Sequence, residues 1–410
     1  MFSNNGLISK KQMRYMLILP TFAGSIFVLP YLFAKMFGKQ MILGIITFTL
    51  MAALYSGLMI ACGNKEDTGK GRFYTVINIT RYMIRLVFYI LMSVEILKEG
   101  QVPFTVGGKY NSIVNYLVLI PLLIVAFYGS DRDVEKQGRI FEMIFAAVFF
   151  PYAAMILFGI KEADFGALAG SESFSLKTSA WNLLFYCYAL LTFITPIEIY
   201  PRLNYRTEKN DDNNVRTFVS VMVMVILLGV LSFIMAAIYG VSGAGSESML
   251  SVAIMRYIEL PMGVLQRFDV LMVWFYMTGC FAVISSMIFN LKELLPADIS
   301  RGGKRKAVLL IVVSAFVISV LMPEYDESLH AFLLYGCFVD LPLSILFALM
   351  NRMKRKTIIM IAAVILITSL TGCSADIENV EERDYATVMM ISRGEEKNCR
   401  FTLGIAKERH

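Results

Sequence analysis

The sequence predicts an all-α polytopic membrane protein with ten transmembrane helices in a five-plus-five inverted repeat, in which helices 1 and 6 are broken. Three observations predict this fold. Hydrophobic residues make up 57% of the chain and charged residues only 17%, whereas a soluble domain carries about 25% charged residues. The apolar residues form long blocks instead of alternating with polar ones. Two of these blocks, the first and the sixth, are interrupted by proline and small residues.

The ten spans follow from length and hydropathy. A helix needs roughly 20 apolar residues to cross the bilayer. Ten stretches before residue 350 approach or meet this requirement, and they define a ten-helix membrane domain over residues 1–350. The stretches are 13–37, 41–61, 75–97, 112–128, 141–160, 181–200, 216–239, 265–290, 306–322 and 330–350.

The basic residues predict the orientation. Lysine and arginine gather on cytosolic loops of membrane proteins, and here they concentrate on every second loop. The opposite loops carry far fewer, so we expect a cytosolic N-terminus in a bacterial cell membrane. The basic loops contain Lys10, Lys11, Arg14, Lys65, Lys70, Arg72, Arg132, Lys136, Arg139, Arg202, Arg206, Lys209, Arg216, Lys292, Arg301, Lys304, Arg305 and Lys306.

Two spans carry the signals of broken helices. The first span contains "LPTFAGSIFVLPY", with Gly24 between two prolines, and the sixth contains "FYCYALLTFITPIEIYP", with Thr192, Thr195, Pro196 and Pro201. Proline removes a backbone donor and disrupts the preceding turn, and irregular backbone at membrane depth survives only where it is buried in protein or lines a cavity. A simple proline kink explains either span alone. The matched positions in two five-span halves favour an inverted repeat with a substrate site at the paired breaks.

The candidate ligand site is placed at these breaks. Unwound backbone offers N–H groups to a carboxylate and carbonyl groups to an ammonium group. We expect the first break at Ala23–Gly24–Ser25, where glycine lets a ligand approach the backbone. Tyrosines of the third and sixth spans could close the pocket, although plain helix packing explains each of them too. The candidate ligand-binding residues are Thr21, Ala23, Gly24, Ser25, Tyr89, Tyr186, Tyr188, Leu191 and Thr192.

Ionisable residues inside apolar spans form a second set of candidates, because a charge is expensive there. Asp340 lies near the middle of the tenth span and has no opposite charge at helical spacing. It could couple a proton or cation, or be a protonated carboxyl bonded to a neighbouring helix. Arg81 and Arg85, four residues apart on the third span, are expected to extend to the membrane interface. Glu198, near the end of the sixth span, is expected to reach water.

Ser285 and Ser286 in the eighth span are candidates for ion coupling. The reason comes from the resemblance to the transporter superfamily described below, whose sodium-coupled members use a hydroxyl pair at a similar place to bind sodium. Interhelical hydrogen bonding explains the two serines equally well. No metal site is expected, since none of the six cysteines has CxxC spacing and the two histidines are isolated. We also expect no cofactor, no nucleic-acid binding and no enzyme activity, because the paired carboxylates lie in polar loops without a neighbouring histidine.

The loop after the seventh span, residues 241–263, is long enough to hold structure of its own. Residues 249–258 can form an amphipathic helix on the membrane surface. An ordinary surface loop is the alternative.

Residues 351–373 have the features of a bacterial lipoprotein signal. "MKRKTIIMIAAVILITSLTGC" (353–373) has a basic start, an apolar run and a final Leu-Thr-Gly-Cys. The apolar run is only about 15 residues, nearer to a signal segment than to a full span. If it is cut before Cys373, that cysteine is the lipidation site; if it is not cut, the stretch is a marginal eleventh span.

Several phrases of the chain resemble the B subunits of bacterial spore germinant receptors. These are "ISKKQM" (8–13), leading into the glycine-containing first span, and "IELPMGVLQRFDVLMVWFYMTG" (258–279), entering the eighth. The resemblance covers about residues 5–350 and implies membership of the amino acid–polyamine–organocation superfamily. It implies that the chain binds a nutrient germinant in the spore inner membrane, together with an A subunit and a lipoprotein C subunit. An amino acid transporter coupled to protons or sodium is the alternative for the same fold.

Residues 374–410 resemble the opening of the mature C subunit. The acidic "EERDYA" follows the cysteine, and "ATVMMIS" and "CRFTLGIA" predict two strands joined by a turn. The segment is far too short for a whole C subunit, so 351–410 resembles the truncated start of the next subunit. The sequence does not decide between a true fusion and a misjoined gene.

Overall fold

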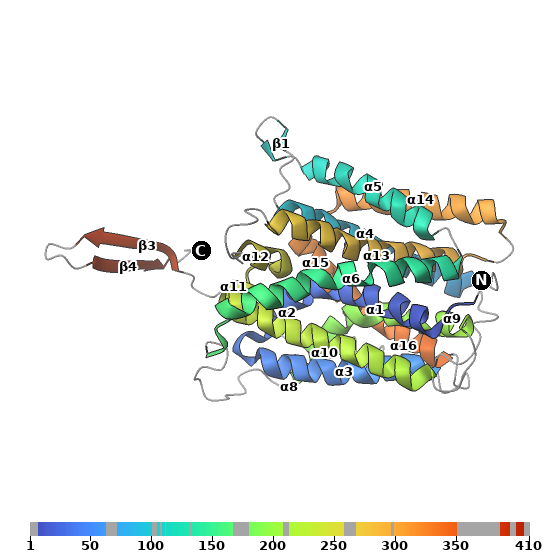
Figure 1. Ribbon diagram of the computed structural model, residues 1–410, viewed down its shortest axis with the longest axis horizontal. Helices are drawn as coiled ribbons and strands as arrows, with labels where there is room; N and C mark the ends of the chain where they lie inside the picture. Colours follow the sequence, from blue (N-terminus) through green and yellow to red (C-terminus); the bar gives the residue numbers. More distant parts are fainter. Residues whose placement is uncertain are drawn as a thin grey trace. The chain divides into compact units, whose positions relative to one another are not determined.

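A computed structural model describes residues 7–62, 72–100, 105–106, 109–110, 112–130, 133–166, 180–207, 213–257, 268–296, 299–350, 386–393 and 399–405. The chain divides into two compact units, Met1–Leu366 and Ile367–His410. Within the described part of the first unit the architecture is helical, apart from a two-residue hairpin of β1 (Thr105–Val106) and β2 (Lys109–Tyr110). Figure 1 shows the long helices of this unit running alongside one another.

Each of the ten predicted stretches coincides with a helix or a run of helices. Two of them are interrupted: the first forms α1 (Lys10–Ile26) and α2 (Leu29–Phe37), and the sixth forms α8 (Ala180–Leu190), the 3₁₀ segment η3 (Leu191–Ile199) and α9 (Tyr200–Tyr205). The uninterrupted ones are α3 (Met41–Cys62), α4 (Arg72–Glu99), α5 (Ser112–Ser130), α6 (Val134–Gly159), α10 (Asn213–Tyr239), α13 (Phe268–Leu294) and α14 (Arg301–Leu321). The tenth forms α15 (Tyr325–Tyr335), the π-helical segment η5 (Gly336–Asp340) and α16 (Leu341–Met350).

Seven described helical runs are long and apolar enough to cross a membrane by themselves. Three predicted spans fall outside this set. The first does so because α1 ends after 17 residues, and the fourth because its searched part, Asn115–Ser130, is shorter than 18 residues. The ninth does so because α14 begins with the basic Lys304, Arg305 and Lys306. Short connecting helices complete the described part: η1 (Gly38–Gln40), η2 (Ile160–Glu162), α11 (Val241–Ala244) and α12 (Leu250–Tyr257). A helix is present after the seventh span as α12, but Leu250–Met255 are buried, so the prediction that it lies on the membrane surface is wrong for these residues.

The first break differs in position from the prediction. Helix α1 runs through Gly24 and Ser25 to Ile26, and the chain turns at Phe27 and Val28 before α2 starts. Pro30 lies in the first turn of α2. Backbone N–H groups in the first turn have no hydrogen-bond partner within the helix, so the N–H that proline lacks is not needed there. Gly24 thus lies inside the last turn of α1, one turn before the break.

The second break is a long 3₁₀ segment. Its nine residues, Leu191–Ile199 with Pro196 inside, far exceed the usual length of a 3₁₀ run. Such segments mark strained or hinge-like positions in helices. The sequence signal at Pro196 therefore predicted the right place but not the type of helix.

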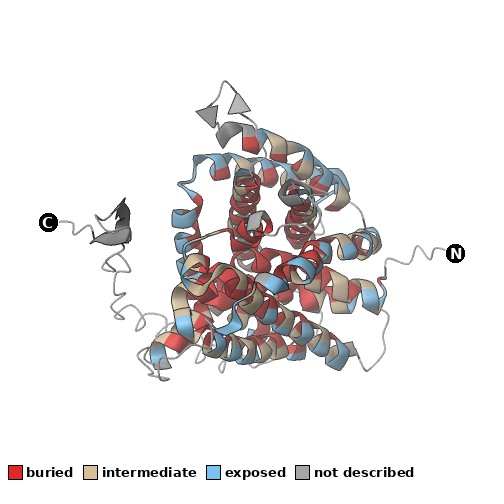
Figure 2. Cartoon of the chain, turned by 60° about the vertical axis from the view of Figure 1, so that its left-hand side comes forward, coloured by how far each residue is buried: buried red, intermediate tan, exposed pale blue. Residues whose placement is uncertain are grey.

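The core lies around α1, which packs against α6, α10, α13 and η3. Figure 2 shows the buried residues on the inward sides of the helices and the exposed residues on their outer sides. Large apolar side chains are exposed on the outside, among them Leu54, Met143 and Leu310, as expected of helices that meet lipid.

In the second unit, β3 (Ala386–Arg393) and β4 (Cys399–Ile405) form an antiparallel hairpin that pairs Ala386 with Ile405 and Arg393 with Cys399. The two strands predicted after residue 385 are thus confirmed. Cys373 and the rest of the 351–385 segment lie outside the described residues.

Candidate functional site

The two breaks meet through Ser25. Its hydroxyl is buried and donates to the Phe193 carbonyl at 3.0 Å and to the Thr21 carbonyl, one turn back in α1, at 2.6 Å. The contact joins the last turn of α1 to η3, although 168 residues separate the two partners. The predicted juxtaposition of the first and sixth spans is present in the structure.

Gly24 and Tyr89 are also in contact. Tyr89, on α4, is 1% exposed, and its hydroxyl would lie 2.9 Å from a methyl group placed on Gly24. Real side chains do not approach so closely, so only glycine leaves room for this phenol. Tyr89 therefore covers the backbone that we expected a ligand to approach, and its role in closing a ligand pocket stays a prediction.

Thr192 faces a third irregular segment. Any side chain at Gly336 would collide with Thr192. The Thr192 side chain of η3 therefore packs directly on the backbone of η5 at Gly336. The Thr192 hydroxyl is buried and has no hydrogen-bond partner among the described atoms. A buried hydroxyl without a partner is unusual in folded proteins. The π-helical segment itself is rare and is frequent at functional sites.

The other predicted ligand residues are spread more widely. Thr21 donates to the Leu17 carbonyl of its own helix at 2.7 Å, and Ala23 packs on Gly279 of α13. Leu191 is buried at the start of η3 and Tyr188 is half-buried one turn earlier. Tyr186 lies edge-on against Phe37, the last residue of α2. Gly24, Ser25, Tyr89 and Thr192 thus form the centre of the candidate site, and Tyr186 borders its α2 side.

A buried cluster of four charges lies beside η3, and it corrects three expectations. Asp340 is 0% exposed and accepts from Arg81 Nε at 2.8 Å and from Arg85 at 2.6 and 3.0 Å. Glu198 accepts from Arg81 at 2.7 Å and from Arg85 at 2.6 Å. Arg81 and Arg85 therefore do not extend to the interface, Glu198 is engaged inside the protein, and Asp340 faces two basic partners.

The cluster is fully bridged and electrically balanced. Two guanidinium groups face two carboxylates, and Arg81 also donates to Asn78 at 2.9 Å. The Ser344 hydroxyl accepts from Arg81 and donates to Glu198 at 2.7 Å. Pairing and hydrogen bonding are what make buried charge tolerable. Because both Asp340 oxygens hold arginine, the ionised carboxylate fits this geometry better than the protonated carboxyl alternative.

The arrangement ties three spans together. Arg81 and Arg85 are on α4, Glu198 ends η3, and Asp340 ends η5. Each irregular segment is therefore anchored at both ends: η3 by Thr192 and Glu198, and η5 by Gly336 and Asp340. A small cavity of about 40 Å³, lined by Asn78, Arg81, Glu198 and other residues, lies next to the cluster and has room for water.

The serine pair of the eighth span is engaged between helices. Ser285 accepts a hydrogen bond from Gln137 Nε2 of α6 at 2.7 Å, and Ser286 is buried. This is the interhelical bonding that we weighed against a sodium site, and ion coupling through these serines stays a prediction. Among the described residues, no group of three histidine, cysteine or acidic side chains could hold a metal ion.

The four charged residues are visible in the sequence, but we did not predict that they form one cluster. The signal that could have predicted it is the equal number of opposite charges in apolar spans: two arginines, four residues apart on one helix face, and two acidic residues. Charges inside a membrane pair with one another as a rule.

The fold defines a polytopic helical membrane protein, and one comparison with solved structures agrees with this fold. No family model and no curated protein sequence matches the chain. The fold is similar to the crystal structure of MhsT in complex with L-phenylalanine, with a TM-score of 0.59 over 88% of this chain and 97% of that one. At 13% sequence identity, this likeness shows the fold alone.

Proposed function

We propose that the chain is the membrane subunit of a nutrient germinant receptor and binds a small germinant, an amino acid in our proposal, where the two breaks meet. The main observation in favour of this binding site is the hydrogen bond from Ser25 to the Phe193 carbonyl. Gly24 and the Thr192 hydroxyl, which has no partner among the described atoms, lie beside it. Small polar groups held by irregular backbone suit a zwitterion, as does the fold of MhsT, whose structure holds L-phenylalanine. The germination role rests on the sequence phrases at 8–13 and 258–279.

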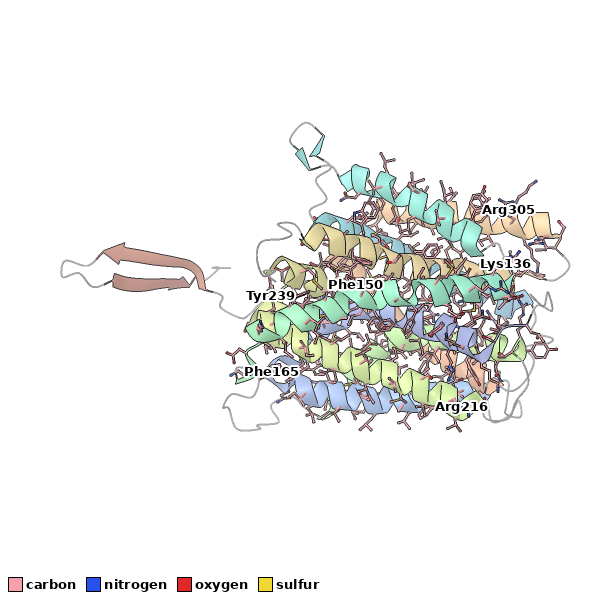
Figure 3. All side chains as sticks on the ribbon, in the orientation of Figure 1. Lys136, Phe150, Phe165, Arg216, Tyr239 and Arg305 are labelled. Atoms are coloured by element: carbon pink, nitrogen blue, oxygen red, sulfur yellow. The ribbon has the colours of Figure 1, made fainter. Side chains whose placement is uncertain are left out.

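The proposed partners and location come from the same resemblance. The subunit acts in the spore inner membrane with an A subunit and a lipoprotein C subunit, its N-terminus in the cytosol. Figure 3 supports this orientation, because Lys136, Arg216 and Arg305 lie at one end of the helices while Phe165 and Tyr239 lie at the other. Residues 351–373 act as a lipoprotein signal ending at Cys373, and 374–410 form the start of a C-subunit-like domain outside the membrane.

In our account, ligand binding acts by moving Tyr89 from Gly24. The ammonium group of an amino acid suits the C-terminal end of α1, where the free carbonyls lie. It needs the space that the Tyr89 phenol now fills, so binding displaces this side chain and with it α4. Because α4 carries Arg81 and Arg85, its movement strains the charge cluster that holds η3 and η5. Binding at the breaks is thereby transmitted to two other spans.

The germination role is tested in spores. Gly24→Ala places a methyl group against Tyr89, whereas Gly57→Ala on α3 makes only an ordinary contact with Phe218 at 3.6 Å. We expect the first variant to raise the nutrient concentration needed for germination and the second to leave it unchanged, at equal protein levels by immunoblot. Identical dose responses for spores that contain or lack the whole gene would overturn the proposed role.

A transporter coupled to protons or sodium is the second candidate, favoured by the fold it shares with MhsT. Vesicles reconstituted with the purified chain decide between the two. Gradient-driven, saturable accumulation of labelled amino acid supports the transporter, and saturable binding without accumulation supports the sensor. For Asp340 to carry a proton, two buried ion pairs would first have to break, which makes it a poor coupling site.

A further inference from the structure

A cavity of about 410 Å³ lies between α4, α14 and α15. Its walls are mainly apolar: Met83, Val87 and Leu91 come from α4, Ile318 from α14, Met322 from the residue after α14, and Ala331 from α15. Three lining residues carry hydroxyl groups: Thr80, Ser328 and Tyr335. None of its lining residues is charged. The volume falls within the range of pockets that bind small ligands, about 300–1,000 Å³.

The cavity is elongated along α4. Its lining positions on this helix begin at Thr80 and repeat every three or four residues up to Leu91, so they share one face. Eleven steps of 1.5 Å make this face about 16 Å long. The face lies in the middle of the third membrane span, 75–97. The slot therefore runs along the helix axis at the depth of the bilayer centre.

The cavity opens to the outside of the helix assembly. Ile318 is 37% exposed and Met322 is 38% exposed, while Val87 at the bottom is 7% exposed. In a membrane-spanning region, exposed apolar side chains meet hydrocarbon instead of water. What enters from that side must be apolar, and a slot parallel to the spans has the shape of a single hydrocarbon chain.

We propose that this cavity is a binding site for one acyl chain of a membrane lipid. The apolar lining, the uncharged walls, the opening toward the lipid and the length along α4 all favour this occupant.

The bound chain presses on the aromatic residues that support the second break. Phe88 and Phe332 stack face to face at the cavity wall, with centroids 4.0 Å apart and planes 3° apart. Both rings approach Phe193, at 6.1 and 5.9 Å, and the Phe193 carbonyl is the one that accepts from Ser25. The lipid is therefore separated from η3 by one layer of rings and holds that layer in place.

Native mass spectrometry of the full chain released from mild detergent tests the site. We expect the wild type to retain one phospholipid. Val87→Trp fills the bottom of the slot, and Leu310→Trp places the same side chain on α14 at a position that is 71% exposed. Displacing two methylene groups is enough to lower retention about tenfold, so we expect that loss for Val87→Trp and none for Leu310→Trp. Equal retention in all three proteins, or none in the wild type, overturns the proposal.

A second measurement keeps the proposal testable if Val87→Trp does not fold. Wild-type protein is reconstituted with phosphatidylcholine that carries a diazirine in the middle of one acyl chain, and the cross-linked peptides are mapped after illumination. We expect cross-links at Val87 and Leu91, which are buried but line the slot, to be as frequent as those at fully lipid-facing Leu310. Cross-links confined to exposed residues such as Leu310 contradict an occupied slot.

Discussion

Replacing Asp340 by asparagine should strongly destabilise the protein. Asp340 is completely buried and accepts three hydrogen bonds from Arg81 and Arg85. Asparagine keeps one acceptor for Arg81 but turns an amide donor toward Arg85, and it leaves two guanidinium groups facing the single carboxylate of Glu198. Removing one partner of a buried ion pair costs about 3–5 kcal/mol, because the other charge stays buried without compensation.

The loss of stability is measured as the change in the free energy of unfolding between variant and wild type, by denaturation in detergent micelles. The control is Asp133→Asn, because the Asp133 carboxylate is 62% exposed and only 4.0 Å contacts join it to Lys136 and Arg301. Such a surface pair contributes about 0–1 kcal/mol. In Asp340→Asn, adding Arg85→Leu removes the excess positive charge, so we expect the double variant to recover part of the loss. If Asp340→Asn unfolds within about 0.5 kcal/mol of the wild type, the cluster is not the anchor described here.

Three further predictions concern the breaks and the tail. Ser25→Ala removes the hydroxyl that joins α1 to the Phe193 carbonyl, and we expect denaturation to show a loss of about 1–3 kcal/mol; an unchanged stability would mean that the breaks are held by other contacts. Gly336→Ala drives a methyl group into Thr192 and should cost about 1–3 kcal/mol by overpacking, whereas Gly302→Ala, which meets nothing within 4 Å, should cost nothing measurable. Cys373→Ser should abolish a lipidated product in mass spectra of membrane-extracted protein, and an intact, unlipidated 46.2 kDa wild-type chain would refute processing.

The sequence predicted the ten spans well because the bilayer imposes long apolar runs that propensity alone would not require. It placed the first break one turn early. Gly24 looked like the break, but glycine inside a helix costs only about 1 kcal/mol, and the packing of Tyr89 on Gly24 needs a helical backbone there. Pro30 was the better signal, since it favours the first turn of a new helix.

The ion cluster and the π-helical segment could not be assembled from the sequence. Arg81 and Asp340 are 259 residues apart, and Arg85 and Glu198 are 113 apart. Helical spacing reveals partners only within one helix, so Asp340 looked isolated although two arginines reach it from α4. The π segment, Gly336–Asp340, has no residue signature of its own that the sequence could show.

The most direct test of the account is equilibrium binding of labelled L-amino acids to the purified chain. The account predicts saturable binding of at least one small amino acid to the wild type and to Gly57→Ala. It predicts binding about tenfold weaker or lost in Gly24→Ala, where Tyr89 and the added methyl group compete for the space at the end of α1. Binding of equal strength to Gly24→Ala and the wild type would contradict a ligand site at the paired breaks.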